Sequence, residues 1–141
     1  FEQINFQVGL EANGYGTGAA VADIDNDGIL ELLVSRGESK AQTLTLYKAK
    51  VDKGSKYLRI KALNNYGAPA RGATVTLITN QRKHSKTIDA GSGYLCQMEP
   101  VAHYGIRKKE KNFKVEIRWT NGSKEMIDIK KLNQTIIVRQ K

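Results

Sequence analysis

Short stretches of alternating or continuous apolar residues, each bounded by glycine or by a polar turn, recur along the chain. In residues 1–50 this pattern predicts strands at 18–22, 29–34 and 43–47, with a further strand or irregular edge at 1–10. Three or four antiparallel strands of this kind make one blade of a β-propeller. A lone blade cannot bury both of its faces, so we expect it either to join other blades upstream or to pack on the C-terminal part of the chain.

A polar linker at residues 51–55 precedes a second series of strands. The strands expected there are 57–63, 73–78, 83–88, 94–97, 114–119, 125–129 and 135–138. The pair Asn121-Gly122 predicts a hairpin turn between two of them, and we find no convincing amphipathic helix. Turns about every 8–12 residues are typical of a β-sandwich. The predicted fold is all-β, with a propeller-type blade in residues 1–50 and an antiparallel β-sandwich in residues 51–141.

The loop between the first two predicted strands is strongly acidic. Three aspartates alternate along it, and a glycine and a glutamate follow. Alternating carboxylates can point at one place, where they repel one another unless a cation lies between them. An all-oxygen ligand set of this density favours calcium over zinc or copper. Water, the carbonyl of Ile29 and four carboxylates are the expected ligands: Asp23, Asp25, Asp27 and Glu31. The alternative is an ordinary acidic turn without metal.

The same residues could also begin an EF-hand, which starts with D-x-D-x-D-G. That loop requires a bidentate glutamate at its twelfth position and a helix on each side. Counted from Asp23, the twelfth position is Val34, which has no ligating side chain, and Glu31 is the ninth. Because the flanks also predict strands, we expect a strand–calcium loop–strand unit.

Two stretches resemble known families. Residues 16–28, Gly-Thr-Gly-Ala-Ala-Val-Ala-Asp-Ile-Asp-Asn-Asp-Gly, resemble the FG-GAP repeat of integrin-like β-propellers, whose acidic loop binds calcium. Residues 90–105 and 115–122 are similar to the ASPIC/UnbV domain. Together, in this order, they resemble the C-terminal region of a family of extracellular, calcium-binding animal proteins.

This resemblance covers about residues 14–138 and implies a secreted, glycosylated protein of the extracellular matrix that takes part in cell adhesion through a protein or glycan partner. The four acidic residues named above match the family's calcium loop, although Glu31 stands where aspartate is more usual. The resemblance supplies no catalytic residue.

Charge is unevenly distributed along the chain. Residues 1–50 hold four Lys or Arg and seven Asp or Glu, whereas residues 51–141 hold nineteen and seven, so the net charges are −3 and +12. The basic half could attract sulfated glycans or an anionic membrane surface, and a merely solvated surface is the alternative. The candidate residues lie in two runs: Arg82, Lys83 and Lys86, then Arg107, Lys108, Lys109 and Lys111. Aromatic residues are not interleaved with these runs, so we expect no nucleic-acid partner.

Candidates for catalysis are few. Cys96 is the only cysteine, which excludes a disulfide within the chain. A dyad of Cys96 with His103 is conceivable, but no hydrolase signature surrounds it. We expect His84 to be a solvated strand residue and His103 to be a core or turn residue. The chain is therefore expected not to be an enzyme.

Secretion is the remaining expectation. Asn121 and Asn133 each begin a triplet that can accept an N-linked glycan in a secreted protein. No apolar run approaches the ~20 residues that cross a bilayer as a helix. The chain starts with Phe1 and shows no signal peptide, so we expect it to be an excerpt of a longer protein.

Overall fold

A computed structural model describes residues 16–37, 41–51, 54–94 and 96–141. Within these ranges the chain is all-β, as predicted, and no helix is long and apolar enough to cross a membrane. The strands in chain order are β1 (Gly16–Ala22), β2 (Glu31–Arg36), β3 (Thr45–Lys48), β4 (Lys56–Leu63), β5 (Thr74–Ile78), β6 (Lys83–Thr87), β7 (Ala102–Ile106), β8 (Lys114–Arg118), β9 (Lys124–Asp128) and β10 (Gln134–Arg139). The strand predicted at residues 1–10 lies outside the described part.

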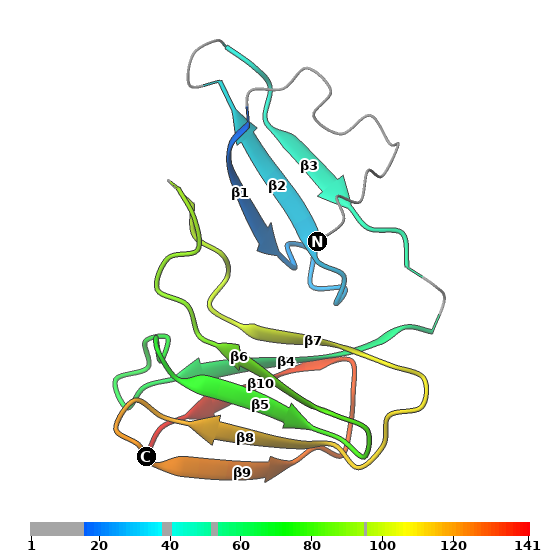
Figure 1. Cartoon of the computed structure of the whole chain (residues 1–141), viewed down its shortest axis with the longest axis vertical. Coiled ribbons are helices and arrows are strands. Elements are labelled where there is room, and N and C mark those ends of the chain that lie inside the picture. Colours follow the sequence, from blue (N-terminus) through cyan, green and yellow to red (C-terminus); the bar gives the residue numbers. More distant parts are fainter. Residues whose placement is uncertain (1–15, 38–40, 52–53, 95) are drawn as a thin grey trace.

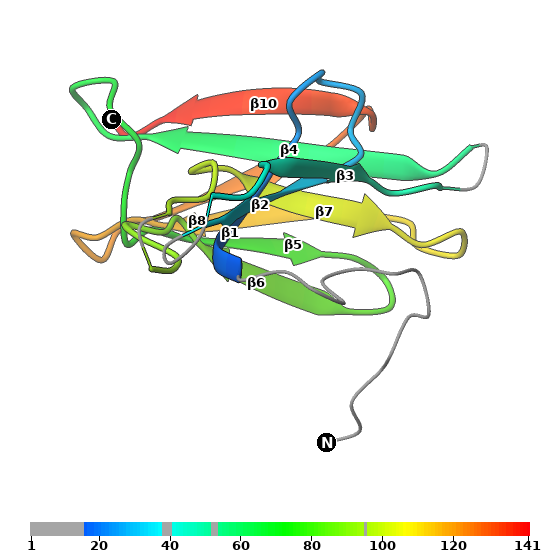
Figure 2. The same cartoon turned by 90° about the horizontal axis from the view of Figure 1, so that it is seen from above.

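The strands form three sheets (Figure 1). The first has the order β1-β2-β3 and is antiparallel throughout. The other two have the orders β10-β4-β7 and β6-β5-β8-β9, and they pack face to face. Viewed from above, the first sheet lies over β4 and β7 (Figure 2). Two statements remain predictions: that this sheet is a propeller blade, and that a domain boundary falls at residue 51.

The core lies between the two larger sheets, and β4 shows how the sequence produces it. Leu58, Ile60 and Ala62 occupy alternate positions and are fully buried at 0% exposure. Side chains of a strand point alternately to opposite faces, so Arg59 and Lys61 face away from this core. The hydroxyl of a buried tyrosine also joins the two sheets, donating to a carbonyl of β5 at 2.8 Å. The main partners in the core are Val75, Leu77, Ala102, Tyr104, Val115, Ile117 and Val138.

The prediction of a purely antiparallel sandwich is wrong for one pair of strands. β10 runs parallel to β4, from Gln134 opposite Leu58 to Arg139 opposite Leu63. Consecutive strands that pair directly through a tight hairpin are antiparallel. β10 does not pair with β9, the strand before it, so this rule does not apply to it. The connection after β9 instead crosses to the other sheet, where the side chain of Asn133 accepts a 3.0 Å hydrogen bond from the Tyr57 amide.

Two further elements differ from expectation. The strand predicted at residues 94–97 is absent, since the described residues there make only an isolated bridge between Gly93 and Cys96. β7 was not predicted, because histidine and glycine alternate with its two buried residues and weaken the apolar signal. The hairpin between β8 and β9 is confirmed, closed by a 3.0 Å bond from the Gly122 amide to the Trp119 carbonyl.

Candidate metal centre

The acidic loop joins β1 to β2 and is shaped by its own carboxylates. Asp23 Oδ2 accepts from the Gly28 amide at 3.1 Å, and Asp27 Oδ1 accepts from the Ile29 amide at 2.8 Å. Glu31 Oε2 reaches back to the Ile24 amide at 2.8 Å. Such bonds from short acidic side chains stabilise tight turns. These hydrogen bonds close the loop without a bound ion.

These bonds bring three carboxylates together. One carboxylate oxygen from each of Asp23, Asp25 and Asp27 lies within 4.8 Å of the others, so the cluster could hold a metal ion. Asp23 is only 4% exposed, whereas the other two are exposed. The buried atom Asp23 Oδ1 makes no hydrogen bond, and Glu31 Oε1 is approached only by a lysine ammonium, at 3.2 Å, among the described residues. Buried oxygens without a donor are costly, and oxygen ligands suit a hard cation, so the residues present fit calcium.

The role of each predicted ligand stays a prediction. Glu31 stands at the start of β2, with one oxygen bonded to the loop amide of Ile24 and the other 3.2 Å from a lysine ammonium. Ile29 is engaged through its amide, and its carbonyl is expected rather than observed to be a ligand.

A lysine that sequence reasoning missed brings a positive charge to the cluster. Lys48 ends β3 directly opposite Glu31 in the strand register. Its Nζ lies 2.5 Å from Asp25 Oδ2, 2.6 Å from Asp27 Oδ2 and 3.2 Å from Glu31 Oε1. The hydrogen bond that Lys48 donates to Asp25 is the main cause that raises the pKa of Lys48, and the hydrogen bond that Lys48 donates to Asp27 is the main cause that lowers the pKa of Asp27. The acidic cluster thus favours a positive charge nearby, and the ammonium group of Lys48 can provide that charge.

An arginine on the sandwich, also missed, contacts the opposite side of the loop. Arg59 projects from the outer face of β4 and is 3% exposed. Its Nη1 lies 3.0 Å from Asp23 Oδ2 and 3.1 Å from Asn26 Oδ1. Its Nη2 donates to both oxygens of Glu99 at 2.6 Å. Two carboxylates therefore neutralise the buried guanidinium, and one of them belongs to the acidic loop.

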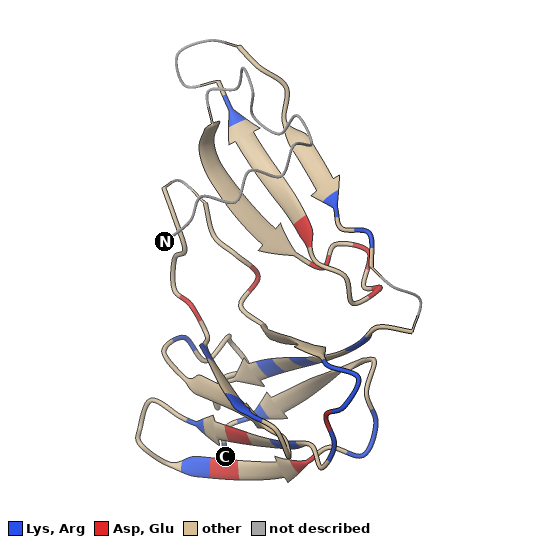
Figure 3. Cartoon of the chain, turned by 45° about the vertical axis from the view of Figure 1, so that its right-hand side comes forward, with Lys and Arg blue, Asp and Glu red and all other residues tan. Residues whose placement is uncertain are grey.

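A close backbone contact completes this junction. Gly28 has a φ of +84°, and a Cβ placed on it would lie 2.0 Å from the ring of Tyr57 on β4. The Tyr57 ring is parallel to that of His103 on β7, with centroids 6.0 Å apart. In Figure 3 the acidic residues of the first sheet gather at the end that faces the sandwich. The acidic loop therefore contacts β4 of the sandwich, through Asp23 against Arg59 and through Gly28 against Tyr57.

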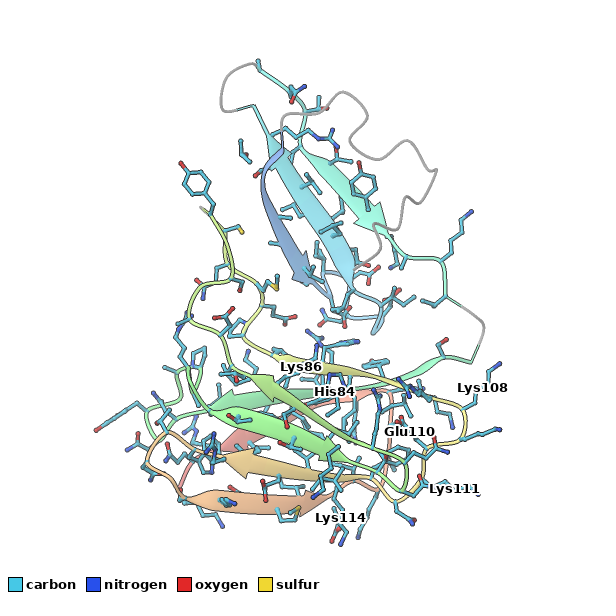
Figure 4. All side chains as sticks on the ribbon, viewed as in Figure 1. His84, Lys86, Lys108, Glu110, Lys111 and Lys114 are labelled. Atoms are coloured by element: carbon cyan, nitrogen blue, oxygen red, sulfur yellow. The ribbon has the colours of Figure 1, made fainter. Side chains whose placement is uncertain are left out.

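The predicted basic residues do not behave as one group. Arg82 forms an ion pair with the buried Glu110 and donates to the Gly105 carbonyl at 3.0 Å, so it joins the turn before β6 to β7. Burial raises the pKa of Glu110, but the Arg107 amide and the Arg82 guanidinium outweigh burial and leave that pKa lowered. Figure 4 shows Lys108 and Lys111 projecting from the loop after β7, away from Lys86 on β6. Lys109 is exposed on the same loop, and Lys83 is exposed on β6.

The residues considered for catalysis have structural contacts. Cys96 Sγ donates to the Ala19 carbonyl at 3.0 Å, which ties the segment before β7 to β1. His103 stacks beside Tyr57, while His84 is half-buried, contrary to expectation, with its ring edge-on to Tyr104. Burial is the main cause that lowers the pKa of both histidines. The thiol thus contacts β1, whereas both imidazoles contact aromatic rings of the sandwich.

The two predicted glycan acceptors are both exposed. The side-chain oxygen of Asn121 accepts bonds from the amide and hydroxyl of Ser123, at 3.0 and 2.7 Å. Asn133 accepts from the amide of Tyr57 and has a φ of 56°. Glycosylation at either position stays a prediction.

Comparison with known proteins agrees with the second resemblance noted in the sequence. The family model described as ASPIC and UnbV matches residues 64–141. Cartilage acidic protein 1 is 46% identical in Xenopus tropicalis, 45% in Homo sapiens and 44% in Mus musculus, each over 122 residues and 86% of this chain. The chain spans only 18–19% of the length of these relatives. The chain belongs to the ASPIC/UnbV family.

Proposed function

We propose that this chain is an extracellular, non-catalytic interaction module in which the acidic loop holds a structural calcium ion. The observation that carries the proposal is the buried Asp23 Oδ1, which lacks a hydrogen-bond donor while its carboxylate lies beside those of Asp25 and Asp27. A calcium ion bound there would supply the missing charge to an all-oxygen ligand set. Asp23, Asp25, Asp27, Glu31 and the Ile29 carbonyl would hold it.

The contacts around the loop support a structural role for the ion. Asp23 takes part both in the cluster and in the buried ion pair with Arg59. Fixing the Asp23 carboxylate therefore also fixes the loop against β4. Lys48, which is exposed and ends an edge strand, is free to swing out when an ion replaces its ammonium group.

The setting and the absence of catalysis are part of the same proposal. The relatives carry the name cartilage acidic protein 1, which supports a secreted protein of the extracellular matrix. An adhesive role with a protein or glycan partner is part of the proposal. Glycans at Asn121 and Asn133 would be compatible with that setting, because both side chains are exposed. The separate contacts of Cys96 and His103 support a non-enzymatic module.

Calcium titration calorimetry, combined with thermal melts in calcium and in EDTA, tests the proposal. At a hundredfold excess over Kd, calcium binding only the native state should add about 2.7 kcal/mol to the unfolding free energy. Asp25→Ala should remove most of this gain, whereas Asp128→Ala, an exposed aspartate of β9, should leave it intact. No heat of binding together with an unchanged melting temperature would reject a calcium site.

A second candidate is binding of a polyanion, either a glycosaminoglycan or an anionic lipid surface. The observation that favours it is the loop after β7, where Lys108, Lys109 and Lys111 are all exposed. Retention on heparin or on anionic liposomes should then fall steeply with salt. Neutralising the three lysines together should abolish retention; salt-independent retention would count against this candidate.

A further inference from the structure

A cleft of about 790 Å³ lies between the acidic loop and the sandwich. Its walls come from the end of the acidic loop, the linker before β4, and the neighbouring strands β6 and β7. Ligand sites for small molecules typically measure about 300–1,000 Å³. The cleft is therefore large enough for a molecule of one or two sugar rings.

The charged side chains around the cleft are mostly basic. Lys56, Lys86 and Arg107 line it, and within the described residues none of the three forms an ion pair. Among the described residues of the lining, Asp27 is the only acidic one, and Lys48 already forms an ion pair with it. The uncompensated charge is therefore positive, which favours an anionic ligand.

Lys86 is the most informative of these residues. β6 alternates between exposed and half-buried positions, so Lys83 lies on the exposed side while His84 and Lys86 lie on the other. Figure 4 shows His84 and Lys86 together on the side of the sandwich that faces the first sheet. A half-buried lysine without a counter-ion loses part of its hydration, and no ion pair in the protein compensates for that loss. A bound anion would restore that balance.

The polar groups of the cleft suit a hydroxylated ligand. His84, His103 and Ser55 line it, and the buried Nδ1 of His103 has no hydrogen-bond partner. A ligand hydroxyl could bond to either imidazole as donor or acceptor, depending on the tautomer. The ring of Tyr57 also lines the cleft, but Gly28 already covers part of it, which disfavours stacking of a nucleobase.

We propose that this cleft binds a short sulfated sugar, with Lys86 and Arg107 holding sulfate groups and His103 accepting or donating a bond to a hydroxyl. The site refines the polyanion candidate by naming a defined pocket instead of the exposed lysine loop. The basic residues that carry it lie on the sandwich, and the acidic loop supplies one wall of the cleft. A membrane surface cannot enter a cleft of this kind, whereas a single sugar unit can.

The test is calorimetric titration of the full chain with a sulfated heparin disaccharide, and with the same disaccharide after removal of its sulfates. The sulfated sugar should bind and the desulfated one should bind at least about tenfold more weakly, because charge-assisted bonds to the lysine and arginine are lost. Lys86→Gln and Arg107→Gln should each weaken binding of the sulfated sugar about tenfold. Lys83→Gln and Lys108→Gln, which remove the same charge outside the cleft, should change it less than about twofold.

Three outcomes would overturn the proposal. One is the absence of disaccharide binding, and another is an equal loss of binding in Lys83→Gln and Lys86→Gln, which would indicate a diffuse charge effect. The third is binding to phosphatidylserine vesicles that is lost in Lys86→Gln while the disaccharide fails to compete. Unchanged melting temperatures of the variants would establish that each is folded. Asp25→Ala should keep its affinity for the sugar, so failure of the calcium proposal and failure of this one are separable.

Discussion

Arg59 and Asp23 form a buried ion pair between the sandwich and the acidic loop, with 3.0 Å between Nη1 and Oδ2 and side-chain exposures of 3% and 0%. The arginine is also bonded to Glu99, in the segment that precedes β7. A single side chain therefore connects three parts of the chain that are distant in sequence. Four changes, in this ion pair, in the acidic loop and in the histidines of the sandwich, test its role and that of its surroundings.

Replacing Arg59 with methionine should destabilise the protein by about 3–5 kcal/mol, because Asp23 would keep a buried charge without its partner. Lys61→Met is the matched control, since Lys61 is an exposed basic residue two positions along the same strand. That control should change stability by no more than about 0.5 kcal/mol. Urea denaturation measures both values, and equal small effects would mean that the ion pair contributes little.

Replacing Lys48 with methionine separates the ammonium group from a metal ion as the source of positive charge. In EDTA the variant should melt at a lower temperature than the parent, because Asp25, Asp27 and Glu31 would then repel one another without compensation. In calcium it should melt at a similar temperature and bind the ion more tightly, since no ammonium competes. Lys50→Met, an exposed lysine just beyond β3, should alter neither property. Weaker calcium binding in Lys48→Met would contradict the competition.

Gly28→Ala should be more damaging than Gly122→Ala, although both glycines have a φ near +85°. Alanine at a left-handed position costs about 1–2 kcal/mol for conformational reasons. A Cβ on Gly122 meets nothing within 4 Å, whereas one on Gly28 would collide with the ring of Tyr57. Chemical denaturation of the two variants gives the difference. Equal losses would show that the loop does not rest on Tyr57.

Acidification should destabilise the protein as the two histidines titrate. Burial, and then the positive charge of Arg82 for His84 and of Arg59 for His103, lowers both pKa values below the usual 6.5. The unfolded chain therefore binds more protons than the native one in this range, so stability rises with pH. It should be complete well above pH 6.5 and fall as the pH drops through that value. Melting curves of the parent at pH 7.5 and 5.5 should differ more than those of a His84→Gln, His103→Gln double variant.

The loop was predictable because its chemistry is local. The three aspartates and Glu31 lie within nine residues, and carboxylate spacing of this kind is recognisable without knowledge of the fold. The residues that neutralise the loop are not local: Lys48 pairs with Asp25 across 23 positions, and Arg59 bonds to Asn26 across 33. Only the register of β3 against β2, and the docking of the loop on β4, bring them together.

Strand alternation identified most of the sandwich but did not reveal the contacts of two side chains on it. A charged residue between buried ones, such as Arg59 between Leu58 and Ile60, normally faces solvent, so the pattern gave no sign that a second layer covers it. The same reasoning made His84 a solvated residue, whereas it lies at the edge of the sandwich against Tyr104. Faces of a sheet that are covered by another unit cannot be distinguished from open ones by alternation alone.

The parallel pairing of β10 with β4 has a consequence for how the protein is made. β4 is the first strand of the sandwich in chain order and β10 is the last, and the bond between Tyr57 and Asn133 spans 76 positions. During synthesis, β4 must therefore remain without its parallel neighbour until all the strands between them and β10 itself have been made. Contacts between residues so far apart also slow folding, because a long loop must close before they form. Assembly of this sandwich is thus completed by the last of its own strands to be translated.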